Sequence, residues 1–102
     1  MEYNKLVRDK IPQIIEAKGG TCRTVVLSEA EYIQKLEEKL SEELSEYLES
    51  RELEELVDLL EVMEALVKAR GETWEELQRI KNAKSEVRGG FEDRILLLES
   101  QK

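Results

Sequence analysis

The stretch from residue 53 to residue 67 carries so many apolar residues that it can be stable only if it is buried from two sides. Projected as a helix at about 100° per residue, its leucines, valines and methionine cover well over half of the circumference. The stretch before it has one narrower apolar stripe, formed by Ile33, Leu36, Leu40, Leu44, Tyr47 and Leu48. A reversal near Ser50 and Arg51 therefore predicts an antiparallel helical hairpin. Because 102 residues offer little else to cover its second helix, we expect a second copy to do so.

Capping signals set the expected helix boundaries. Ser28 followed by Glu31 is a capping box, Ser50 is the expected cap of the next helix, and Thr73 with Glu76 forms another capping box. Pro12 is tolerated in the first turn of a short helix that stops at the glycines 19 and 20. Four helices are thus predicted, over approximately residues 10–18, 28–49, 51–70 and 74–88.

Two short segments break the helical pattern. Residues 21–27 (TCRTVVL) are rich in β-branched side chains, and residues 94–98 contain an apolar run that could pair with them in an extended conformation. The sequence as a whole predicts a single all-α domain over residues 1–102, in which the hairpin forms a four-helix-type bundle across a dimer, with short extended segments near 21–27 and 94–98.

Composition excludes several classes of function. The net charge of −8 opposes binding to the phosphate backbone of nucleic acids, and the single Cys22 rules out an internal disulfide bond. The absence of histidine excludes a Ser-His-Asp arrangement. Charged residues throughout the first fifteen positions do not fit a signal peptide, and no apolar run is long enough to span a membrane. We therefore expect a cytoplasmic protein without membrane or nucleic-acid partners.

Two pairs of carboxylates lie at equal distances on either side of the expected reversal. Glu43 with Glu46, and Glu55 with Asp58, are each three residues apart, which places both members of a pair on one helix face, about 5 to 6 Å apart at Cβ. In an antiparallel hairpin Glu46 faces Glu55 and Glu43 faces Asp58. Four converging carboxylates need a positive charge between them, and oxygen-only ligands suit Mg²⁺ or Mn²⁺. The spacing predicts a metal site.

An alternative interpretation uses no metal chemistry. With 24 acidic residues among 102, such spacings also arise by chance on solvated helices. The chain would then be a non-enzymatic helical dimerisation module with an acidic face, or with a structural metal site. Against this, Glu55 falls within the broad apolar arc, where an unpaired carboxylate is costly and a leucine would be more stabilising.

The acidic motifs resemble those of a known superfamily. The sequence EELSE at residues 42–46, followed by ELVD at 55–58, is similar to the EExxE and ExxD motifs of the MazG-like, all-α nucleoside triphosphate pyrophosphohydrolases. The segments YNKLVRDKIPQII, ELVDLLEVMEAL and RGGFEDRI resemble one branch of phosphoribosyl-ATP pyrophosphohydrolase-like proteins. The resemblance covers nearly the whole chain, although the stretch between the acidic motifs is shorter than in most members.

The resemblance implies a helical homodimer, or a dimer of dimers, that hydrolyses the α,β-phosphate bond of a nucleotide and serves in house-cleaning. By position, Glu43, Glu46, Glu55 and Asp58 match the Mg²⁺ ligands of the superfamily, and Glu42 matches the first glutamate of its motif. Either Glu42 or Glu46 could accept the proton of the attacking water.

Basic residues are expected to contact the substrate phosphates. Asn82, Lys84 and Arg94 resemble residues of the nucleotide-contacting segment of the superfamily. The full set of candidates is Lys5, Arg8, Lys10, Asn82, Lys84, Arg88 and Arg94. The sequence leaves open the base and sugar of the substrate, the number of metal ions, and the choice between dimer and tetramer.

Overall fold

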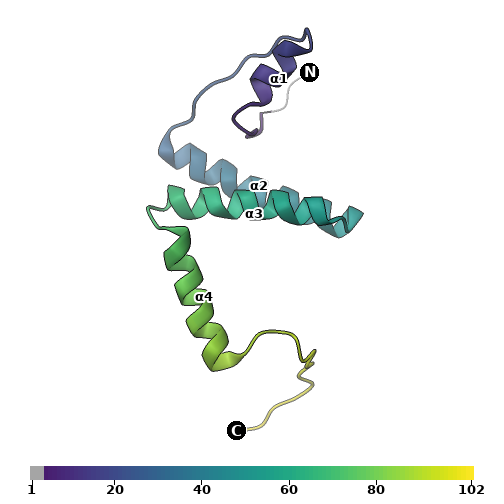
Figure 1. Ribbon diagram of the computed structural model, residues 1–102, viewed down its shortest axis with the longest axis vertical. Coiled ribbons are helices and arrows are strands. Elements are labelled where there is room, and N and C mark those ends of the chain that lie inside the picture. The colour runs from purple at the N-terminus through teal and green to yellow at the C-terminus, as the bar shows by residue number, and fades with distance from the viewer. Residues whose placement is uncertain (1–3) are drawn as a thin grey trace.

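The computed structural model describes residues 4–102, and Figure 1 shows their arrangement. Within this range there are four helices and no strand: α1 (Ile11–Ala17), α2 (Glu29–Ser50), α3 (Leu53–Ala69) and α4 (Trp74–Arg88). The prediction of an all-α fold is confirmed, and each expected helix is present with its boundaries shifted by no more than a few residues.

Helices α2 and α3 form the antiparallel hairpin at the centre of the molecule (Figure 1). The reversal is tight because Arg51 adopts a left-handed conformation with φ of 62°. The expectation that Ser50 caps α3 is wrong, since the residue at the N-cap is Glu52. Ser50 remains the last residue of α2, and its hydroxyl accepts a hydrogen bond from the Glu52 backbone N–H at 3.2 Å.

The other helix starts follow the capping signals. Ser28 Oγ accepts from the Glu31 backbone N–H at 3.3 Å, and Glu31 Oε1 accepts from the Ser28 backbone N–H at 3.3 Å, which completes the capping box of α2. At α4 only half of the expected box forms. Thr73 Oγ1 accepts from the Glu76 backbone N–H at 3.1 Å, while the Glu76 side chain accepts from Arg79 at 2.8 Å instead.

The segment before α1 contacts both helices of the hairpin. Arg8 reaches Asp58 on α3, and Lys35 on α2 donates to the backbone carbonyl of Asn4. Helix α1, with Pro12 in its first turn, lies above the hairpin in the view of Figure 1 and is joined to α2 by a long connector. None of the helices within residues 4–102 has the length and apolar character needed to cross a bilayer.

The two segments expected to be extended do not pair within the chain. Residues 21–27 and 94–98 are both non-helical, but neither forms a strand. The first lies between α1 and α2 and the second lies beyond α4, at opposite ends of the molecule (Figure 1). The predicted pairing is therefore wrong for a single chain, because the hairpin and α4 hold the two segments apart. Their apolar side chains remain exposed, with Val26 fully accessible and Leu98 85% accessible.

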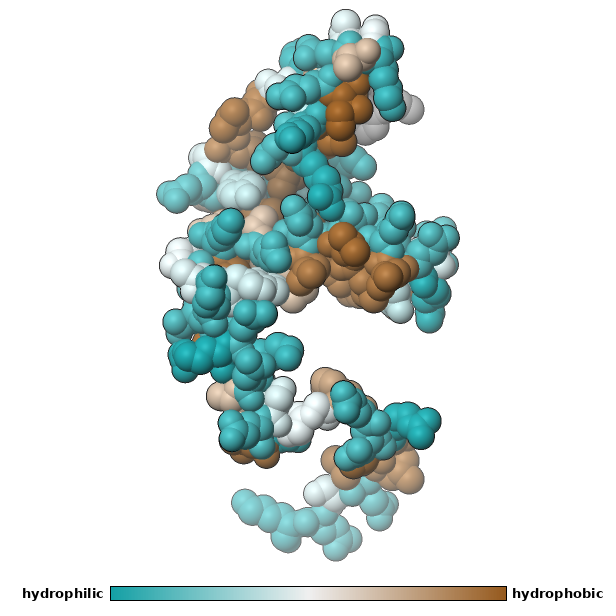
Figure 2. Space-filling model, in the orientation of Figure 1, coloured by the Kyte–Doolittle hydropathy of each residue, from teal (hydrophilic) through white to brown (hydrophobic). Residues whose placement is uncertain are grey.

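The chain covers little of its own apolar surface. Among the described residues, the buried hydrophobic side chains are Leu36 and Val62, at 2% and 8% exposure. The radius of gyration of 18.3 Å exceeds the value of about 13 Å typical of a compact domain of this length. Figure 2 shows apolar side chains gathered along one edge of the hairpin. The exposed apolar residues of α2 and α3 are Leu44, Leu48, Leu53, Leu56, Val57, Leu60 and Met63.

Candidate functional site

The hairpin brings three of the four predicted carboxylates together. Oxygens of Glu43, on α2, and of Glu55 and Asp58, on α3, all lie within 4.8 Å of one another. Glu43 is buried, with 6% of its surface exposed, while Glu55 and Asp58 are half-buried. The spacing of three residues puts Glu55 and Asp58 on one face of α3, and the antiparallel packing turns this face towards Glu43. We refer to these three residues as the carboxylate cluster.

Glu46 lies beside the carboxylate cluster and is not a member of it. Its side chain is exposed to solvent, yet its charge acts on both Glu43 and Glu55. Glu46 and Glu55, which we predicted to face each other across the hairpin, are thus close enough for their charges to interact. Glu46 can approach a bound ligand from the solvent side, whereas Glu43 is held in the interior.

Burial is the main perturbation of Glu43. Desolvation raises the pKa of its carboxyl group, because the charged form loses contact with water. Glu46 raises this pKa further, both through a hydrogen bond that a protonated Glu43 can share and through charge repulsion, and Asp58 adds repulsion. The ammonium group of Lys39 opposes these effects. The positive charge of Lys39 thus offsets only part of the effects that destabilise the charged form of Glu43.

The pKa of Glu55 is also raised. The largest cause is desolvation, followed by repulsion from Glu46, Asp58 and Glu52, while a hydrogen bond from Ser50 acts in the opposite direction. The pKa values of two members of the cluster are therefore raised when no cation lies between them. A divalent cation would reverse the sign of this local field.

One oxygen of Glu43 has no partner. Its Oε1 lies 3.5 Å from Lys39 Nζ, but its Oε2 is buried without any hydrogen-bond partner among the described residues. Leaving a buried acceptor unsatisfied costs about 1–3 kcal/mol, so such groups usually have a partner. An oxygen-coordinated cation such as Mg²⁺ or Mn²⁺ would satisfy this atom, and the all-oxygen ligand set suits it.

Cationic side chains surround the carboxylate cluster. Arg8 Nη2 donates to Asp58 Oδ1 at 2.7 Å, and Arg8 Nη1 lies 3.7 Å from Glu61 Oε1. The predicted candidate Glu42 forms ion pairs with Lys5, at 3.5 Å, and with Lys39, at 3.4 Å.

Lys39 is a site residue that the sequence reasoning missed. Its side chain is only 17% exposed and pairs with both Glu42 and Glu43. Its position four residues before Glu43 on the same helix was the available signal, since side chains at this spacing are neighbours. Lys39 places a positive charge at the inner side of the cluster.

A cavity of about 760 Å³ adjoins the cluster. It lies between the N-terminal segment with α1 and the hairpin, and Glu43 and Asp58 form part of its wall. Its apolar lining includes the buried Leu36 and Val62, and Tyr32 is its aromatic residue. Its basic residues are Arg8, Lys10, Lys39 and Lys68. The size is within the range of about 300–1,000 Å³ typical of small-molecule sites.

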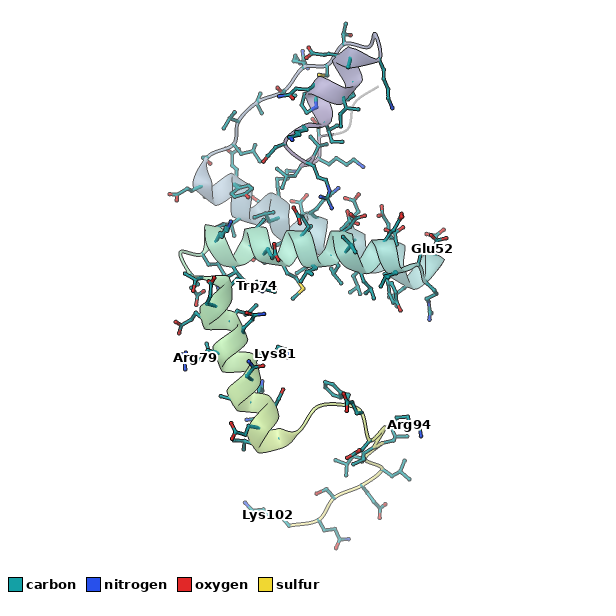
Figure 3. All side chains as sticks on the ribbon, in the orientation of Figure 1. Glu52, Trp74, Arg79, Lys81, Arg94 and Lys102 are labelled. Atoms are coloured by element: carbon teal, nitrogen blue, oxygen red, sulfur yellow. The ribbon has the colours of Figure 1, made fainter. Side chains whose placement is uncertain are left out.

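The remaining predicted substrate residues lie elsewhere. Asn82, Lys84 and Arg88 are on α4, and Arg94 is in the C-terminal tail, where its φ is 56°. Helix α4 packs against α3 alone among the described helices and then leads away from the hairpin. Figure 3 shows Lys81 on α4 and Arg94 in the tail, both remote from the hairpin. Within one chain these residues do not meet the carboxylate cluster, whereas Lys5, Arg8 and Lys10 lie near it.

Comparison with known proteins adds no family assignment. The chain has no significant match among protein-family models, curated proteins or solved structures. The resemblance to the MazG-like superfamily stays a prediction based on the motifs in the sequence.

Proposed function

We propose that the protein is a Mg²⁺-dependent nucleotide pyrophosphohydrolase that converts a nucleoside triphosphate, or a phosphoribosyl nucleotide, to a monophosphate and pyrophosphate. The observation that carries this proposal is the buried, unpartnered Oε2 of Glu43, a residue whose carboxylate lies among carboxylates from two helices. Mn²⁺ is an alternative cation at the same ligands.

Glu43, Glu55 and Asp58 would hold the cation in this proposal, with Glu46 completing the ligand set from the solvent side. A bound divalent cation neutralises phosphate charge and lowers the pKa of a water molecule. The Glu43 side chain is packed inside the hairpin and is only 6% exposed. Its burial favours a fixed ligand position over a transient ion contact.

The ion pairs distinguish the two candidate proton acceptors. The carboxylate of Glu42 is engaged in ion pairs with Lys5 and Lys39. Glu46 is exposed and lies beside two carboxylates whose pKa values are raised. We therefore assign the general base to Glu46 and a positioning role to Glu42, which holds Lys5 and Lys39 near the site.

Phosphate contacts would come first from the cations of the cavity. Arg8 and Lys39 are nearest to the carboxylate cluster, and Lys10 and Lys68 lie on the cavity wall. In the proposed dimer, or dimer of dimers, the α4 and tail residues Asn82, Lys84, Arg88 and Arg94 would act from a second copy. The exposed apolar edge of the hairpin supports such an assembly.

The non-enzymatic alternative is favoured by a different observation. The hairpin exposes apolar side chains such as Leu53, at 75%, and Val57, at 54%, as a dimerisation module would. An exposed apolar surface is compatible with both functions. A buried, unsatisfied Glu43, in contrast, would only destabilise a purely structural module.

The test is a screen of nucleotides with Mg²⁺, with pyrophosphate release as the readout. We expect release by the wild-type protein, loss of release in Glu55→Gln, and unchanged release in Glu54→Gln. Glu54 is the matched control, because it is the adjacent glutamate on α3 and its side chain is exposed. Absence of pyrophosphate release with every nucleotide, or equal release by Glu55→Gln and the wild type, would favour the non-enzymatic module.

A further inference from the structure

The N-terminal segment of residues 4–10 lies across the acidic face of the hairpin, where two of its basic side chains form ion pairs. Arg8 makes the shortest contact, donating from Nη2 to Asp58 Oδ1 at 2.7 Å, with Nη1 at 3.7 Å from Glu61. Lys5 lies 3.5 Å from Glu42. The segment thus brings positive charges to the surface on which the carboxylate cluster is built.

The Arg8 contact falls on a member of the cluster. Asp58 is one of the three residues whose oxygens converge. The Arg8 guanidinium and a cation bound at the cluster would therefore compete for its carboxylate. A guanidinium and a divalent cation repel each other, and at a few ångströms this repulsion is substantial even near a protein surface. Coordination of a divalent cation by Asp58 would therefore weaken the ion pair between Asp58 and Arg8.

The same segment covers the cavity. Leu6, Val7 and Arg8 form part of the cavity wall opposite the hairpin residues Leu36 and Val62. Release of Arg8 from Asp58 would loosen this wall. Cation binding at the cluster and access to the cavity are then linked through one ion pair.

We propose that Arg8 is a built-in counter-ion of Asp58 which a divalent cation displaces, so that cation binding frees the N-terminal segment and opens the cavity to an anionic ligand. This inference rests on the cation site of the proposed function. Before the cation arrives, Arg8 offsets the repulsion within the cluster. After displacement, its guanidinium is available to a phosphate group, for which its donor geometry is suited.

Linkage fixes the expected direction of the effect. If the cation weakens the Arg8 contact, the Arg8 contact must weaken cation binding by the same factor. The Arg8 and Asp58 side chains are 54% and 40% exposed, and an ion pair this exposed changes an equilibrium by about fivefold at most. Removing the guanidinium should therefore tighten cation binding by roughly two- to fivefold.

The first experiment titrates the full-length chain with Mn²⁺, with free Mn²⁺ followed by electron paramagnetic resonance. We expect Arg8→Gln to bind Mn²⁺ roughly two- to fivefold more tightly than the wild type. Lys5→Gln is the matched control, because it removes the same charge from the same segment but pairs with Glu42, outside the cluster. Its effect should be clearly smaller than that of Arg8→Gln.

Glu55→Gln separates the two proposals. If Mn²⁺ binding is lost in Glu55→Gln while Arg8→Gln binds no more tightly than Lys5→Gln, the counter-ion role of Arg8 is wrong and the metal site stands. If the wild-type protein binds no Mn²⁺, both proposals are wrong.

The second readout is limited proteolysis after Lys5 and Lys10, which reports local opening of residues 4–10. Mg²⁺ should accelerate cleavage at these two sites in the wild type, and Arg8→Gln should be cleaved rapidly without Mg²⁺. Cleavage that is unchanged or slowed by Mg²⁺ in the wild type would refute displacement, because the segment would then stay in place when the cation binds.

Discussion

Replacement of Glu43 by glutamine tests whether the buried carboxylate of this residue binds a cation. In the absence of divalent ions, Glu43→Gln should be more stable than the wild type. The amide removes the charge that is repelled by Glu46 and Asp58, and its NH₂ group can donate to a neighbouring carboxylate. Its carbonyl can still accept from Lys39, which lies 3.5 Å from the present Oε1.

The magnitude follows from the environment of the side chain. With 6% exposure and an unpartnered Oε2, the carboxylate carries a desolvation penalty of about 1–3 kcal/mol. The ion pair with Lys39, at a spacing of four residues, stabilises the folded state by only about 0.5 kcal/mol. The net gain of Glu43→Gln should be about 1–2 kcal/mol, which corresponds to a rise in Tm of about 4–8 °C per kcal/mol for a domain of this size.

The assay is thermal unfolding at one fixed protein concentration, in EDTA and in excess Mg²⁺. A cation at 100 times its Kd stabilises the wild type by about 2.7 kcal/mol, whereas Glu43→Gln should lose most of this gain. Glu42→Gln is the matched control. It removes the partner of Lys5 and Lys39 at a side chain that is 33% exposed, so it should lose less than about 1 kcal/mol and keep the Mg²⁺ response. A Glu43→Gln protein that is less stable than the wild type in EDTA, or that keeps the full response to Mg²⁺, would refute the reasoning.

Three further predictions concern pH, assembly and turnover. Because the pKa values of Glu43 and Glu55 are raised in the folded state, the folded protein binds more protons than the unfolded chain, so stability in EDTA should fall as pH rises from the ordinary glutamate pKa of about 4.3 through the raised values. Urea unfolding at a series of pH values checks this, and a rise in stability over that window would contradict it. Leu60→Glu, at a position 45% exposed on the apolar edge, should prevent the proposed dimer from forming, because a charge buried at its interface is costly. Sedimentation equilibrium that shows the same mass for variant and wild type would contradict an interface at this edge. Asp58→Asn should lower kcat by about 100-fold or more, equivalent to about 2.7 kcal/mol, while Lys84→Gln should raise KM and leave Mn²⁺ binding unchanged. A loss of Mn²⁺ binding in Lys84→Gln would argue against its assignment as a phosphate contact.

The helix boundaries were predictable because their causes are local. The capping box of Ser28 and Glu31 and the Thr73 cap of α4 act over three residues, and both appear in the structure. The predicted cap at Ser50 failed for a reason that is not local. The tight reversal needed a left-handed residue, Arg51, and moved the N-cap to Glu52.

The sequence by itself determined the helical hairpin and the convergence of Glu43, Glu55 and Asp58, since apolar periodicity sets which faces pack and equal spacing from the reversal sets which residues meet. Only the tertiary structure decided the burial of each carboxylate, because burial depends on the neighbours that other elements supply. It placed Glu46 at the solvent side and left Glu43 Oε2 unpartnered inside. It also brought Arg8 to Asp58, fifty positions along the chain, a contact that no local pattern encodes.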